Sequence, residues 1–86
     1  MTRRKSEVTK AAIDREYPFQ VELRVPDGGF GRRLAEIDNF CRGKLHAKRP
    51  ATKSGAFFSR WCFANAVLAA EFHGRFGGMR IDVRQA

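Results

Sequence analysis

Residues 56–63, Ala56-Phe57-Phe58-Ser59-Arg60-Trp61-Cys62-Phe63, form the densest aromatic stretch of this 86-residue chain. Aromatic residues are enriched in β-strands, so the stretch predicts a central strand. Alternate side chains of a strand point to opposite faces, which puts Phe57, Trp61 and Phe63 together on one face. Three large rings on one face predict that this strand contributes heavily to the core.

A rival interpretation is one long helix over 56–76, because apolar residues of this part of the chain also recur at helical spacing. Asn65 is a favourable N-cap residue, and it favours a strand that ends before a helix over about 66–76. Gly77-Gly78 ends that helix, and the alternation that follows predicts a last strand. The apolar residues of this last strand are Met79, Ile81 and Val83.

Upstream, residues 17–26 alternate between apolar and polar side chains and predict a half-buried strand. Residues 30–45 carry apolar side chains at helical spacing, and Gly43 is suited to end that helix. The polar connection over 46–55 contains a possible short edge strand at Ala47 to Arg49. Residues 1–15 show no sustained period and predict a flexible basic tail, with a turn of helix through Val8 to Ile13 left open within it.

These elements predict a single α+β domain over 16–86, with two helices on one face of a three- to four-stranded, mostly antiparallel sheet. The order of elements resembles the βαββαβ pattern of the ferredoxin-like plait. The chain is also similar to small uncharacterised bacterial proteins in which a strand such as Trp61-Cys62-Phe63 leads into a helix ending in Phe-Gly-Gly, here Phe76-Gly77-Gly78. This resemblance implies a fold and names no activity.

The predicted core leaves the other face of the sheet open to solvent. The expected core residues of the strands are Phe19, Val21, Leu23, Val25, Phe57, Trp61, Phe63, Met79, Ile81 and Val83. The open face would then carry Gln20, Glu22, Arg24, Phe58, Arg60, Cys62, Arg80, Asp82 and Arg84. Four arginines stand there against two acids, and cross-strand ion pairs are the simplest account of them.

Positive charge is concentrated in the middle of the chain. The chain has a formal net charge of +8, from 17 Lys and Arg against 9 Asp and Glu. Residues 39–70 hold six bases and no acid, whereas the flanking segments are nearly balanced. Such a segment attracts polyanions, because a bound phosphate backbone releases its counterions. The alternative is a solvated basic loop that keeps the protein soluble.

The charge pattern predicts a small non-enzymatic binding protein that contacts RNA or DNA through phosphates. The contact residues expected from it are Arg42, Lys44, Lys48, Arg49, Lys53 and Arg60, and Phe58 is a candidate for stacking on a base. The aromatic stretch does not match the motif of RNA recognition modules, so base readout of that kind is not expected. The alternative function is interaction with an acidic protein or with a second copy of the chain.

Other site classes find little support in the sequence. Cys41, His46, Cys62 and His73 do not have the spacing of a zinc site, so no metal or other cofactor is expected. No nucleophile and base are suggested as a pair, so no enzyme is expected. Two cysteines do not form a disulfide framework, and no apolar run suits a leader or a membrane span. These features together predict a cytoplasmic protein with free thiols.

Overall fold

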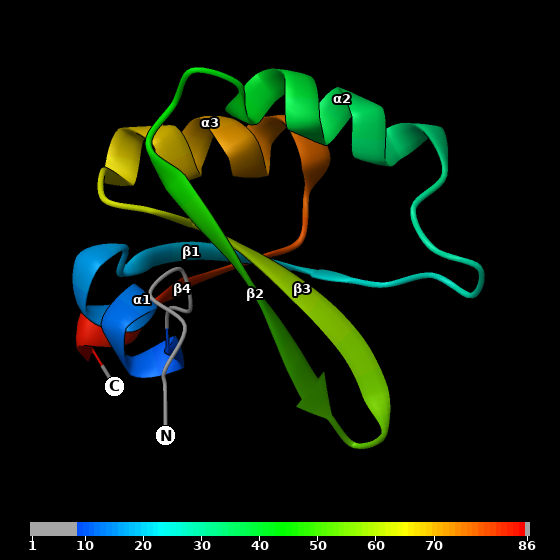
Figure 1. Ribbon diagram of the computed structural model, residues 1–86, viewed down its shortest axis with the longest axis horizontal. Helices are drawn as coiled ribbons and strands as arrows, with labels where there is room; N and C mark the ends of the chain where they lie inside the picture. Colours follow the sequence, from blue (N-terminus) through cyan, green and yellow to red (C-terminus); the bar gives the residue numbers. More distant parts are fainter. Residues whose placement is uncertain (1–8, 86) are drawn as a thin grey trace, which may run out of the picture.

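The computed structural model of the protein describes residues 9–85 and confirms a strand at the aromatic stretch. β3 (Ala56–Phe63) lies inside the sheet and pairs with a strand on each side. The rival interpretation, one helix over 56–76, is therefore wrong. The remaining elements are α1 (Lys10–Glu16), β1 (Phe19–Arg24), α2 (Arg32–Cys41), β2 (His46–Lys53), α3 (Ala66–Phe76), β4 (Met79–Asp82) and a 3₁₀ turn, η1 (Val83–Gln85) (Figure 1).

The sheet has four strands in the order β2-β3-β1-β4, and every neighbouring pair is antiparallel. α2 joins β1 to β2 and α3 joins β3 to β4, and both helices lie over the same face (Figure 1). Each of these helices therefore connects two strands that have one other strand between them. The predicted α+β architecture with two helices on one face of an antiparallel sheet is confirmed.

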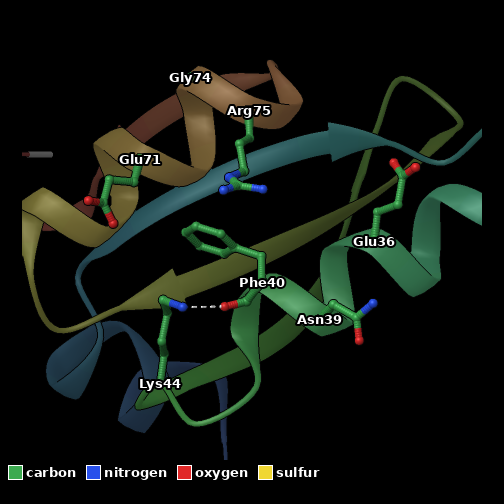
Figure 2. A pocket seen from close by; sticks show the side chains of 7 residues that line it. All are labelled: Glu36, Asn39, Phe40, Lys44, Glu71, Gly74 and Arg75. Carbon is green, nitrogen blue, oxygen red and sulfur yellow. Dashed lines mark hydrogen bonds between the residues drawn. The ribbon is translucent and has the colours of Figure 1, made fainter.

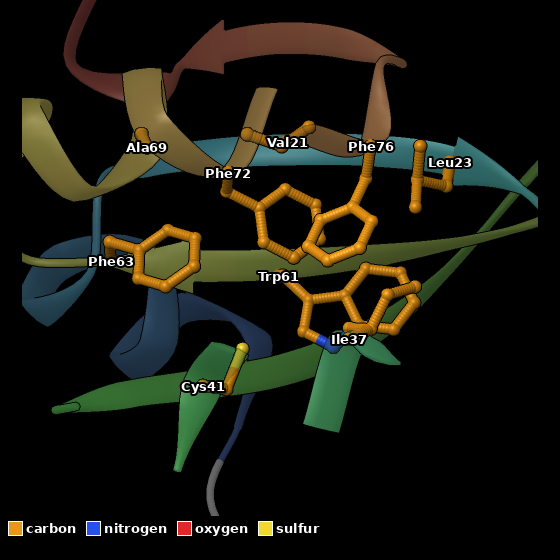
Figure 3. Packing of buried hydrophobic residues seen from close by; sticks show 9 residues of the cluster. All are labelled: Val21, Leu23, Ile37, Cys41, Trp61, Phe63, Ala69, Phe72 and Phe76. Carbon is orange, nitrogen blue, oxygen red and sulfur yellow. The ribbon is translucent and has the colours of Figure 1, made fainter. Parts of the chain in front are cut away.

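An aromatic core fills the space between the sheet and these two helices. Phe72 of α3 is at its centre, with its ring centroid 5.6 Å from that of Trp61 and 4.9 Å from that of Phe76 (Figure 3). Rings at these separations attract one another in addition to the hydrophobic gain of burial. The core cluster consists of Val21, Leu23, Ile37, Cys41, Trp61, Phe63, Ala69, Phe72 and Phe76.

Both ends of α3 follow the sequence signals. The side chain of Asn65 accepts a hydrogen bond from the Val67 amide at 2.6 Å, as expected of an N-cap. After the helix, Gly78 brings the chain directly against β1, and its φ is +92°. A Cβ at this position would lie 2.5 Å from the Glu22 carbonyl oxygen, so only glycine fits. This close approach sets where β4 begins.

The face expected for β4 is wrong. The register pairs Met79 with Glu22 and Ile81 with Gln20, so these apolar residues share the face opposite the helices. Met79 is 58% exposed rather than part of the core. Alternation predicts that every second side chain shares a face, but not which of the two sets faces the helices. Because β4 is a four-residue strand at the sheet edge, a charged residue such as Arg80 can lie on the helix side and still be exposed.

The connection after α2 contains a longer strand than the predicted Ala47 to Arg49. β2 pairs with β3 over eight residues, and the two strands are joined by a tight turn at Ser54-Gly55. Both turn residues have positive φ, 50° and 80°, as a type I′ hairpin turn requires. The β2–β3 hairpin extends well beyond the two helices (Figure 1). Phe57 lies in this outer part and is 68% exposed, which corrects its expected place in the core.

The second face of the sheet is not fully open as expected. Residues 10–15, predicted as part of a flexible tail, belong to α1, whereas residues 1–8 of that tail lie outside the described residues. α1 packs against β2, β3 and η1 on the face away from α2 and α3, and its Ile13 is buried (Figure 1). Gln20 and Cys62, expected to face solvent, are therefore completely buried.

Candidate nucleic-acid interface

The β2–β3 hairpin contains four of the six bases predicted to contact a polyanion, and strand geometry divides them between two faces. Lys48 pairs in register with Trp61 and therefore lies on the side of α2 and α3. We call this side of the hairpin the helix-side face; it comprises His46, Lys48, Pro50, Thr52, Phe57 and Ser59. The other side, which we call the second face, comprises Ala47, Arg49, Ala51, Lys53, Phe58, Arg60 and Cys62, and continues into Gln20 and Glu22 of β1.

Glu22 forms ion pairs with two of the bases of the second face. Its carboxylate accepts a hydrogen bond from Arg60 Nε at 2.9 Å and lies 2.8 Å from Lys53 Nζ. Burial of this side chain opposes its ionisation, but the hydrogen bonds from Lys53 and Arg60 outweigh that effect. The pKa of Glu22 is therefore lowered below its ordinary value. The carboxylate stays charged at neutral pH and neutralises part of the basic segment.

Asp14 of α1 holds the third base. Its Oδ1 lies 3.0 Å from Arg49 Nη1 and accepts a second hydrogen bond from Gln20 Nε2 at 2.8 Å. Gln20 in turn accepts a hydrogen bond from Arg60 Nη1 at 3.1 Å through its Oε1. A continuous chain of polar contacts thus runs from α1 across β1 and β3 to the hairpin turn. Arg49, Lys53 and Arg60 are all engaged with acids from outside the basic segment.

The helix-side face has no comparable acids. Within residues 9–85, Lys48 has no carboxylate partner, and its ammonium group lies 5.6 Å from the centroid of the Trp61 ring. Arg42 and Lys44, in the turn before β2, likewise form no ion pair with a described acid, and Arg42 is exposed. Of the six predicted contact residues, these three therefore form no ion pair with an acid of residues 9–85.

The exposed aromatic residue of the hairpin is not the expected one. Phe58, the predicted stacking residue, is half-buried on the second face, and Lys53 Nζ lies 5.6 Å from its ring centroid. Phe57 is on the helix-side face, beyond the helices, and is largely exposed. The alternation of the strand separates these two neighbours, but no local pattern indicates how far the hairpin extends past α2 and α3.

A groove of about 660 Å³ lies between α2 and α3. Phe40 lies at its centre, with Lys44 Nζ 4.5 Å and Arg75 Cζ 5.5 Å from its ring centroid (Figure 2). Lys44 also donates a hydrogen bond to the Phe40 carbonyl oxygen at 2.7 Å. Glu36 and Glu71 line the same groove. Because two acids offset two bases, the groove does not offer a polyanion the attraction of the helix-side face.

Cysteine chemistry is suppressed in this fold. Cys41 and Cys62 are both free and buried, and burial raises the pKa of each thiol, that of Cys62 to about 12. Over residues 9–85, no group of three or more His, Cys, Asp and Glu side chains is placed to hold a metal ion. In the same part of the chain, no helix has the length and apolar character needed to cross a membrane.

Comparison with known proteins does not assign the chain to a family. No protein-family model, no curated protein and no solved structure gives a significant match to the chain. The geometry and electrostatics of the hairpin are therefore the features from which a function can be inferred.

Proposed function

We propose that the protein is a small non-enzymatic binding protein that contacts single-stranded RNA or DNA through the helix-side face of the β2–β3 hairpin. The observation that carries the proposal is Phe57, a ring 68% exposed on a projecting strand, on the same face as Lys48, which has no carboxylate partner among residues 9–85. Single-stranded nucleic acids are bound by this combination: bases stack on exposed rings, and lysines follow the phosphates. The exposed Arg42 adds a further positive charge in the turn that leads into β2, the edge strand of the sheet.

The alternative function, pairing with an acidic protein or with a second copy, would use the same edge. β2 is an eight-residue edge strand, which is long enough to accept an added strand. However, Pro50 lacks an amide proton, and the positive charge of Lys48 repels a second copy of the same edge. These residues oppose strand addition and leave the side chains of the face as the contact surface, which supports the nucleic-acid proposal.

We also infer a ferredoxin-like plait and a cytoplasmic location. The fold assignment is supported by the two connections, β1-α2-β2 and β3-α3-β4, whose strands interleave in the sheet. α1 and the long hairpin are additions to that pattern. The location is supported by two free thiols, which persist where disulfides are kept reduced.

The test is fluorescence anisotropy of a labelled uridine-rich RNA and a matching DNA, titrated with protein at low and at physiological salt. Phe57→Ala is expected to weaken binding roughly 5- to 150-fold, because a stacked base contributes about 1–3 kcal/mol. Lys48→Ala is expected to weaken it a few-fold and to reduce the slope of log K against log salt by about 0.7. Matched controls are Met79→Ala and Arg80→Ala, which make similar changes at exposed positions of β4, the opposite edge of the sheet.

Absence of binding at low salt, or an equal loss with the β4 controls, would overturn the proposal. Stronger binding to duplex than to single strands would contradict the stacking role of Phe57. Sedimentation of the protein without nucleic acid tests the alternative, since a concentration-dependent dimer that Phe57→Ala leaves intact would favour pairing through the edge.

A further inference from the structure

We propose that the second face of the hairpin contains a phosphate-binding site that Asp14 of α1 occupies in this structure. The inference rests on the proposed function, since the phosphate is that of a single-stranded nucleic acid. Arg49 Nη1 lies 3.0 Å from Oδ1 and 3.4 Å from Oδ2 of Asp14, and Gln20 Nε2 lies 2.8 Å from Oδ1. Two donors from two strands thus converge on one anion, as they would on a phosphate group.

The donors of this site are held in place, one of them fully buried and the other largely so. The side chain of Arg49 is 12% exposed, and Gln20 is fully buried. Arg60 lies directly opposite Arg49 in the register and donates to the Oε1 of Gln20, which orients the amide so that its Nε2 points at the anion. Because Arg60 is itself held by Glu22, the arrangement does not depend on α1 alone.

Asp14 does not satisfy every hydrogen-bond donor of Arg49. Arg49 Nε is buried and has no hydrogen-bond partner among residues 9–85. A carboxylate offers two acceptor oxygens, whereas a terminal phosphate offers three and carries more charge. A terminal phosphate therefore fits the donors of Arg49 and Gln20 better than the single carboxylate that is present.

α1 is an element that a ligand can displace. It has seven residues, and a helix of that length is not stable alone in water. Its buried residue is Ile13, and its side-chain links to the sheet within the described residues are those of Asp14. Phosphate binding at Arg49 would release Asp14, detach α1 and uncover Cys62, which is completely buried on the same face. In the resting protein, α1 therefore lowers the apparent affinity for nucleic acid.

The decisive variant is Asp14→Asn, which removes the competing charge with little change in shape. It is expected to bind the labelled RNA roughly 3- to 10-fold more tightly than the unaltered chain, because a larger fraction of molecules has an accessible site. The matched control is Glu16→Gln, an equal change of charge at an exposed position of the same helix, with no ion pair among residues 9–85. Oligonucleotides with and without a terminal phosphate, and inorganic phosphate as competitor, distinguish a terminal group from the backbone.

A second readout follows α1 directly. Thiol labelling, located by peptide mapping, is expected to modify Cys62 faster in Asp14→Asn, and faster in the unaltered chain when RNA is added. Cys41, buried on the helix side of the sheet, is the internal control and should not change. If Asp14→Asn unfolds, as rapid labelling of Cys41 would reveal, Ile13→Ala loosens α1 with the carboxylate kept and is expected to give the same two effects.

Equal affinities of Asp14→Asn and Glu16→Gln, or slower labelling of Cys62 on addition of RNA, would overturn this site. In that case, loss of binding in Phe57→Ala would still uphold the proposed function. If the unaltered chain binds no oligonucleotide and Asp14→Asn binds none, both proposals fail.

Discussion

The two faces of the β2–β3 hairpin come from the same eight register pairs, yet they differ in charge. The second face has three bases, and each is joined to Asp14 or Glu22. The helix-side face has Lys48, which has no carboxylate partner in residues 9–85, and the exposed ring of Phe57. Both acids come from residues 1–38, where eight bases and seven acids nearly cancel in the sequence. The net charge of a segment is therefore not the charge of the surface that it forms.

The largest expected effect is a difference in the free energy of unfolding between substitutions in the inner and the outer part of β3, on its helix side. Phe63 is completely buried, and Phe63→Ala is expected to cost about 3–5 kcal/mol in free energy of unfolding. Phe57 lies on the same side of the same strand but beyond the helices, and Phe57→Ala should cost less than about 0.5 kcal/mol. Urea denaturation followed by the fluorescence of Trp61 measures both. Similar losses for the two variants would mean that the outer hairpin is packed rather than exposed.

A smaller difference in the free energy of unfolding is expected between substitutions on the two faces of the hairpin. Glu22→Gln leaves Arg60 and Lys53 without a charged partner, and we expect it to cost about 1.5–3 kcal/mol of stability. Lys48→Ala, on the helix-side face, breaks no ion pair with a described acid and should cost less than about 0.5 kcal/mol. A further control is Glu36→Gln at an exposed position of α2. If Glu22→Gln costs no more than these controls, the second-face network contributes little to folding.

Sequence reasoning predicted those parts of the fold that local patterns determine. The strand at 56–63, the N-cap at Asn65 and the end of α3 at Gly77 all depend on neighbouring residues, and all are present. The prediction of which β4 side chains face the helices was wrong. Alternation shows that every second residue shares a face but not which set faces the helices, and here the close contact of Gly78 with β1 accompanies a register that turns Met79 and Ile81 away from them.

The candidate site was predicted less completely, for a physical reason. The six bases were recognised from the local absence of acids, but pairing with Asp14 and Glu22 depends on tertiary contacts that no local pattern reveals. The exposure of Phe57 depends on the length of β2 relative to the helices, and the sequence predicted this strand over Ala47 to Arg49 alone. A useful signal was available in Ser54-Gly55, a dipeptide suited to a tight hairpin turn between two extended segments.

The smallest expected effect is on how the stability cost of a substitution depends on pH, which should differ between Glu22 on the second face and Lys48 on the helix-side face. Because the folded chain lowers the pKa of Glu22, its ionised form stabilises the fold above the ordinary value of 4.5, and that contribution is lost as pH falls through the folded pKa. The difference in unfolding free energy between the unaltered chain and Glu22→Gln should therefore be constant near neutral pH and shrink below about pH 4.5. The cost of Lys48→Ala involves no described carboxylate and should not change over this range. Urea denaturation of the three proteins from about pH 7 to about pH 3 measures this. A difference for Glu22→Gln that persists unchanged in acid would show that the side chain stabilises through its shape and hydrogen bonds, and that charge does not distinguish the two faces energetically.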